Sequence, residues 1–141
     1  MSYTYKKWSE LTLGCELQLE VGPISRTDIV RFAGASGDFN PNHHDEIFAI
    51  RNGFEKVFAM GPLSVGYLAK MLNENIGPVS FRKFQIRFVS QVWPGDVLIC
   101  KAIVTKQYNE SGENLIDMDI RVFNQHETSI VTGNLTAVPQ G

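Results

Sequence analysis

Polar and apolar residues alternate along several short stretches of the chain, which is typical of strands with one buried face. The first stretch is Glu16–Val21, which ends at Gly22-Pro23. The second half of the chain holds four more predicted strands: Lys83–Phe88, Val97–Val104, Ile116–Val122 and Ser129–Val138. Because these four follow one another with short connections, we expect them to pair in antiparallel fashion.

Two polar segments are expected to turn the chain between these strands. Pro94-Gly95-Asp96 has the composition of a tight turn, and Asn109–Asn114, which contains Gly112, has that of a hairpin loop. The second half of the chain is thus expected to consist of strands and turns alone.

Helical spacing replaces alternation between the first strand and the other four. Ser25-Arg26-Thr27-Asp28 has the form of a capping box and predicts a short helix that stops at Gly34 or Gly37. Asp45 is expected to cap a second helix over Glu46–Arg51. Asn52-Gly53 is expected to end that helix.

A third helix is predicted over Pro62–Leu72, where proline suits the first turn. This helix is apolar on nearly every side, so it belongs in a core. The predicted fold class is α+β: an antiparallel sheet wrapped around this buried helix, with residues 1–141 forming one domain.

Composition narrows the classes of partner. The formal net charge is -2, without the clustered basic face that nucleic acid requires, so we expect no nucleic-acid partner. The chain lacks a signal-peptide pattern and any run near the ~18 apolar residues that cross a bilayer, so we expect a cytoplasmic protein with no membrane partner. Cys15 and Cys100 are expected to be buried, reduced thiols.

The candidate chemistry lies in the loop between the first two helices. Asp38, Asn40 and His43 lie around Pro41, which prevents a regular helix and stiffens the loop. A carboxylate and an imidazole held close together are able to divide the work of moving two protons. Alternatively, Asp38 and Asn40 are ordinary turn residues, and His44 and Asp45 are solvated. The spacing does not match a metal site, and we expect no metal.

The same loop resembles the signature of the MaoC-like dehydratases, which include the R-specific enoyl-CoA hydratases. The residues that match are Phe32, Ser36-Gly37-Asp38, Asn40-Pro41, His43, Asp45 and Phe48-Ala49. Looser similarity continues through Phe58–Leu63 and Arg87–Asp96. The resemblance implies a hot-dog fold, a dimer and an acyl thioester substrate carried by coenzyme A or acyl carrier protein, with no cofactor.

The resemblance also implies roles for particular residues. Asp38 and His43 would add water reversibly to a 2-enoyl thioester to give the R-3-hydroxyacyl product, with His43 as the base and Asp38 as the acid, or the reverse. Asn40 would orient the pair. The backbone N–H of Gly61 would stabilise the enolate oxygen at the start of the buried helix. The neighbouring residues Met60, Pro62 and Leu63 would complete the substrate site.

Two positions depart from the family pattern. Asn42 replaces an aliphatic residue, and Met60 replaces a histidine. Two alternatives stay open. One is an acyl thioesterase, since hot-dog proteins also hydrolyse thioesters. The other, suggested by the second departure, is a catalytic subunit of a heteromeric dehydratase that is inactive alone. Lys83 and Arg87 are expected to be solvated, with contact to coenzyme A phosphates as the alternative. For the dimer, we expect the Val97–Val104 region to form the buried surface.

Overall fold

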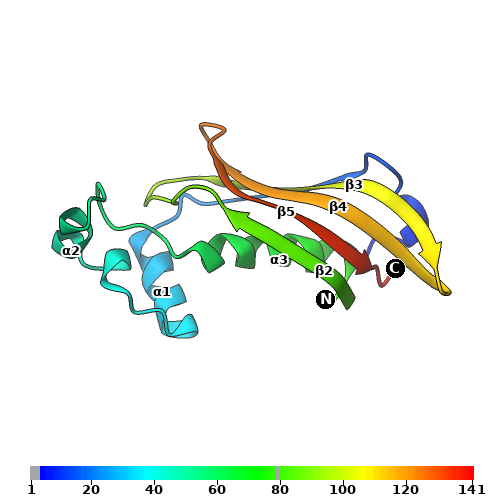
Figure 1. The fold of residues 1–141 in the computed structure, drawn as a ribbon, viewed down its shortest axis with the longest axis horizontal. Helices are drawn as coiled ribbons and strands as arrows, with labels where there is room; N and C mark the ends of the chain where they lie inside the picture. Colours follow the sequence, from blue (N-terminus) through cyan, green and yellow to red (C-terminus); the bar gives the residue numbers. More distant parts are fainter. Residues whose placement is uncertain (1–3, 79) are drawn as a thin grey trace.

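A single antiparallel sheet forms the body of the molecule (Figure 1). The structure is a computed structural model that describes residues 4–78 and 80–141. The five strands lie in the order β1-β3-β4-β5-β2, so β1 and β2 are the edges. Their bounds are β1 Glu16–Val21, β2 Ser80–Phe88, β3 Leu98–Glu110, β4 Glu113–Asn124 and β5 Ser129–Val138. The five predicted strands and their antiparallel pairing are confirmed.

The long helix α3, Gly61–Ile76, lies along the concave face of this sheet (Figure 1). Leu68, Met71, Leu72 and Ile76 are fully buried in the core between helix and sheet. The prediction of a core helix is confirmed, but the prediction that it is apolar on nearly every side is wrong for one face. There Gly66, Lys70 and Asn73 are exposed, because the sheet covers the helix from one side only.

The other two α-helices begin at the capping residues that the sequence predicted. In α1, Arg26–Ser36, the Asp28 N–H donates to Ser25 Oγ at 3.0 Å and the Ser25 N–H donates to Asp28 Oδ2 at 2.8 Å. This capping box lowers the pKa of Asp28, chiefly through the hydrogen bond from the Ser25 backbone. The helix ends at Gly37, whose φ of 77° suits glycine. Helix α2, Glu46–Arg51, starts at Asp45, which accepts from the Phe48 N–H at 3.0 Å.

A hairpin turn lies within Asn109–Asn114 as predicted, but it is shorter than this segment. The strands β3 and β4 continue into the segment and pair Asn109 with Asn114 and Glu110 with Glu113. Only Ser111 and Gly112 turn the chain, both at positive φ (52° and 81°), as a type I′ hairpin turn requires. A side-chain hydrogen bond of 3.0 Å between Asn109 and Asn114 keeps these polar residues in the ladder.

The two cysteines differ in burial. Cys100 on β3 is fully buried, and burial raises the pKa of its thiol to about 12. Cys15 precedes β1 and is only half-buried, so the prediction of burial is wrong for it. Its place outside the strand explains the difference.

The apolar surface expected at Val97–Val104, on which the predicted dimer contact rested, is covered within the chain itself. Strand β3 lies between β1 and β4, and Leu98, Cys100, Ala102 and Val104 already pack in the core. Apolar side chains are instead exposed on edge strand β2 and the residue after it, where Phe81 is 38%, Phe88 52% and Val89 51% exposed.

An arm formed by residues 26–51 extends past the end of the sheet and comprises α1, the short 3₁₀ helix η2, Pro41–His43, and α2 (Figure 1). It connects β1 to the segment that leads into α3. Val30, Phe39, Ile47 and Ile50 are exposed on it. A second 3₁₀ helix, η1, Trp8–Glu10, precedes β1. No helix in the described parts of the chain is both long and apolar enough to cross a membrane.

Candidate active site

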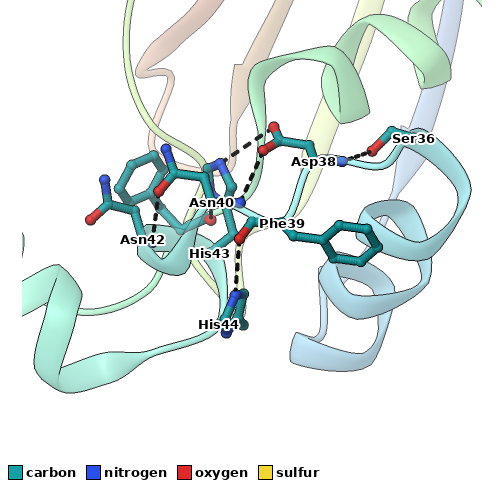
Figure 2. Close-up of polar contacts among 8 residues, drawn as sticks. Ser36, Asp38, Phe39, Asn40, Asn42, His43 and His44 are labelled. Carbon is teal, nitrogen blue, oxygen red and sulfur yellow. Dashed lines mark hydrogen bonds and ion pairs between the residues drawn. The ribbon is translucent and has the colours of Figure 1, made fainter.

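The loop that carries Asp38 and His43 is held by its own side chains (Figure 2). Pro41 starts η2, and the side chain of Asn40 caps it by accepting from the Asn42 N–H at 3.0 Å. The Asn40 N–H in turn donates to Asp38 Oδ1 at 3.3 Å, and the Asp38 N–H donates to Ser36 Oγ at 3.2 Å. These short-range bonds fix the direction of the Asp38 side chain.

His43 is buried at the end of η2, with 8% of its surface exposed. Its Nδ1 lies 2.7 Å from the carbonyl oxygen of Phe58. A carbonyl oxygen only accepts hydrogen bonds, so Nδ1 carries the proton and Nε2 of the neutral ring has a free lone pair. The Phe58 ring meets the imidazole edge-on, at 5.0 Å between centroids, and this contact helps to hold its plane.

Nε2 of His43 faces Oδ2 of Asp38 at 3.6 Å (Figure 2). This separation exceeds a direct hydrogen bond, and a neutral Nε2 and a carboxylate are both acceptors. A water molecule beside the pair would satisfy both groups by donating one proton to each. The Asp38 side chain is 41% exposed, so the pair is open to solvent on the side of Asp38. The structure therefore brings together the two residues that the sequence singled out.

The other polar residues of the loop have structural partners. The carboxamide oxygen of Asn40 caps η2, whereas the sequence placed it as an orienting group for the pair. His44 Nε2 bonds to the Phe39 carbonyl oxygen at 3.2 Å, and Asp45 caps α2. Asn42, which departs from the family pattern, accepts a hydrogen bond of 3.0 Å from Asn52 and so ties η2 to the end of α2.

A cavity of about 280 Å³ lies where the chain enters α3. Phe58 connects it to the pair, because its carbonyl oxygen binds His43 while the residue lines the cavity. Asp38 and His43 are themselves outside the lining. Its lining includes Phe58, Met60, Gly61, Ser64, Phe88 and Val92.

Gly61 is the first residue of α3, and Met60 supplies no side-chain cap. The Gly61 N–H has no partner among the described residues. A Cβ at this position would lie 2.7 Å from Cε1 of Phe88, so only glycine keeps the backbone open beneath that ring. The prediction that Gly61 begins the buried helix is confirmed.

The three residues next to Gly61 that the sequence assigned to the substrate site lie in different positions relative to the cavity. Met60 lines the cavity but is only 2% exposed, so it is a buried wall. Pro62 is exposed at the rim. The side chain of Leu63 packs in the core and is not in the lining, against its predicted place in the substrate site. Ser64 and Phe88 line the cavity instead. Sequence reasoning missed both, although Ser64 follows Gly61 by one helical turn.

Charged groups outside the loop add little to this site. Lys83 and Arg87 are exposed on β2, and neither lines the cavity. Within residues 4–78 and 80–141, His, Cys, Asp and Glu side chains form no cluster of three that could hold a metal ion. The chemistry available here is proton transfer by Asp38 and His43 next to an uncapped helix N-terminus.

Comparison with known proteins agrees with this arrangement. Residues 8–127 match the family model described as the MaoC like domain. The chain is 36% identical over 84 residues to the (R)-specific enoyl-CoA hydratase of Rhodospirillum rubrum, covering 58% of each chain. It is also 36% identical over 89 residues to the peroxisomal hydratase-dehydrogenase-epimerase of Saccharomyces cerevisiae, covering 60% of this chain and 10% of that protein. These alignments thus span about half or less of the relatives' lengths.

Solved structures extend the similarity to the whole fold. The R-hydratase PhaJ1 of Pseudomonas aeruginosa superimposes with a TM-score of 0.84 at 28% identity, over 94% of this chain and 84% of that one. The (R)-hydratase of A. caviae involved in PHA biosynthesis gives 0.81 at 24% identity, over 92% and 97%. The predicted hot-dog fold is confirmed.

Proposed function

Since this chain belongs to the MaoC-like domain family, we propose that it is a hydratase/dehydratase that adds water reversibly to 2-enoyl thioesters, giving R-3-hydroxyacyl thioesters. One observation carries the proposal: Nε2 of His43 and Oδ2 of Asp38 face each other at 3.6 Å, with Nδ1 of the imidazole bound to the Phe58 carbonyl. The names of the R. rubrum and P. aeruginosa relatives support it.

Water activation is the first step. The hydrogen bond to Phe58 leaves Nε2 of His43 as the basic nitrogen, so His43 takes a proton from the water held beside the pair. The water oxygen bonds to C3 of the enoyl group, and the electron pair of the 2,3-double bond moves onto the thioester oxygen. The Gly61 N–H, at the positive end of α3, would stabilise that oxygen.

Return of the proton completes the addition. The protonated Nε2 faces the Asp38 carboxylate, which accepts the proton and delivers it to C2 of the enolate. The enolate electron pair forms the new C–H bond, so water is added across the double bond and both residues regain their starting state. The reverse sequence is dehydration. The loop hydrogen bonds that involve Asn40 and Ser36 keep Asp38 in position for both directions.

A mass-spectrometric assay tests the proposal. The purified protein is incubated with 2-enoyl-CoA substrates of several chain lengths, and the products are separated. Hydration adds the mass of one water and leaves the thioester intact, whereas a thioesterase releases free coenzyme A. Chiral analysis of the 3-hydroxy product is expected to give the R enantiomer. Release of free thiol without hydrated thioester would replace this function by the thioesterase alternative.

The second candidate function is that of a catalytic subunit that needs another hot-dog chain. Met60, where the family pattern has histidine, favours it because the changed residue is a wall of the cavity. This candidate predicts that the chain is inactive alone and active when its partner chain is added. Both candidate functions use a substrate that is carried by coenzyme A or acyl carrier protein. In both, we propose that residues 1–141 act as one domain and that the protein works in the cytoplasm.

We expect the protein to form a homodimer through the open edge of β2. In the described sheet β2 pairs with β5 alone, and an unpaired edge with exposed aromatic residues favours pairing with another chain. Sedimentation is expected to give a dimer at micromolar concentration, and Phe81→Glu is expected to give a monomer. Leu13→Glu is the control, because Leu13 is 74% exposed but precedes the opposite edge strand, β1. A wild-type monomer contradicts the prediction.

Met60→His is expected to change KM and acyl preference more than kcat on the best substrate. The residue lines the cavity, whereas the proton-transfer pair lies on another segment, so binding common to ground and transition states is affected most. The measurement is kcat and KM for several enoyl thioesters, with Met60→Leu as an apolar control. A rise in kcat by orders of magnitude on every substrate would favour the dependent-subunit alternative.

A further inference from the structure

One buried hydroxyl group in the molecule lacks a partner. Ser64 is 1% exposed, and its Oγ has no hydrogen-bond partner among the described residues. Buried polar groups in native proteins are almost always paired, because leaving one unpaired is destabilising. Ser64 is one of the residues that line the cavity at the start of α3, so a molecule bound there is able to supply the missing partner.

Ser64 lies on the same face of α3 as Gly61, whose N–H is also unpaired. Residues three apart lie on one face of a helix, and each Cα–Cβ bond tilts toward the helix N-terminus. The side chain of Ser64 therefore leans toward the first turn. The residues between add no donor, because Pro62 has no N–H and the Leu63 N–H donates to the Met60 carbonyl oxygen at 3.0 Å. The Gly61 N–H and the Ser64 hydroxyl are thus the two unpaired donors that the first turn of α3 offers to the cavity.

We infer that the Ser64 hydroxyl is the second donor of a two-donor site for the thioester oxygen, beside the Gly61 N–H. This inference rests on the proposed hydratase function. The segment Phe58–Gly61 spans at most ~10 Å between its end Cα atoms, so a thioester bound at Gly61 reaches toward the pair that is tied to Phe58. Phe88 and Val92 form apolar walls for the rest of the acyl group.

Ser64→Ala is the primary test. Turnover is expected to fall about 10–100-fold with little change in KM, because a donor aimed at developing charge acts mainly in the transition state. The melting temperature is expected to rise by about 3 °C, because the variant removes an unpaired buried hydroxyl and alanine is the better helix former. Ser64→Thr keeps the hydroxyl and is expected to retain most of the turnover. Ser129→Ala, a half-buried serine outside the cavity, is the matched control.

A second readout does not depend on turnover. Butyryl-CoA labelled with ¹³C at the carbonyl has no double bond to hydrate, and its carbonyl stretch in the infrared falls when the oxygen accepts hydrogen bonds. Bound to the wild type, the stretch is expected to lie below that of free butyryl-CoA, and Ser64→Ala is expected to lose part of this shift. Equal stretches and equal kcat in both proteins overturn the inference and leave the hydratase function intact.

The remaining outcomes separate the two proposals. A wild type that hydrates no substrate, while Ser64→Ala still loses the infrared shift, removes the hydratase function and keeps the donor. A variant with lower kcat and a lower melting temperature but an unchanged infrared shift assigns Ser64 a structural role and overturns the inference. A wild type that neither hydrates enoyl-CoA nor binds butyryl-CoA overturns both.

Discussion

Asp38→Asn and His43→Gln are each expected to lower turnover by at least ~100-fold while the melting temperature stays nearly unchanged, because positioned acid–base groups contribute about 10²–10⁴-fold. Asparagine has no carboxylate to relay the proton, and glutamine has no basic nitrogen to face the water. Asp38 is half-buried and asparagine has nearly the same size. Glutamine in place of His43 gives up the edge-on ring contact with Phe58 but is still able to donate a hydrogen bond to the Phe58 carbonyl oxygen. Steady-state kinetics on the best enoyl-CoA and thermal denaturation are the measurements.

His44→Gln is the matched control for this experiment. His44 is adjacent in sequence and has the same side chain, but it is exposed and bonds to the Phe39 carbonyl outside the pair. It is expected to keep near-normal turnover. Near-normal activity in Asp38→Asn or His43→Gln would remove that residue from the mechanism.

Gly133→Ala is expected to destabilise the protein by about 3 kcal/mol or more, which is at the upper end for a single added carbon. A Cβ at Gly133 on β5 would lie 2.0 Å from the carbonyl oxygen of Gln85 on β2. That neighbour is backbone in a paired strand, so it is not able to rotate away as a side chain would. Displacing β2 would also move Phe88, the residue that covers Gly61. Urea denaturation gives the change in the free energy of unfolding.

Gly66→Ala is expected to change the free energy of unfolding in the opposite direction in the same experiment. Gly66 lies on the exposed face of α3, and an added Cβ meets nothing within 4 Å. Alanine there is expected to stabilise by roughly 0.5–1 kcal/mol through helix propensity. Equal effects of the two substitutions would contradict the close approach of β2 to β5 at Gly133.

The elements were predictable from sequence wherever the signal is local. Ser25 and Asp45 accept backbone N–H groups within three residues, so the helix starts followed from the sequence alone. The strands followed from alternation. The turn between β3 and β4 lies in the predicted segment, but its length did not follow from the sequence, because polar residues in an exposed hairpin look like loop residues until their cross-strand partners are known.

The candidate site was predictable only in part, because some of its contacts join residues that are far apart in the sequence. Asp38 and His43 are five residues apart, and Pro41 between them signalled a fixed loop. The partner of the imidazole, the Phe58 carbonyl, carries no side-chain signature at all. Leu63 and Ser64 are adjacent in the sequence, yet one faces the core and the other the cavity, and this is set by how α3 is rotated against the sheet.

The arm that carries Asp38 and His43 has a consequence for how the protein would lose activity on heating. Of its two α-helices, α1 buries only Ile29 and Ala33 and α2 only Ala49, whereas β3 and β4 are paired on both sides within the sheet. Segments with few buried contacts open locally, without global unfolding. Amide hydrogen exchange is therefore expected to be faster over Arg26–Arg51 than over β3 and β4. Inactivation by heat would then begin with reversible opening of the arm, at temperatures where the sheet is still folded.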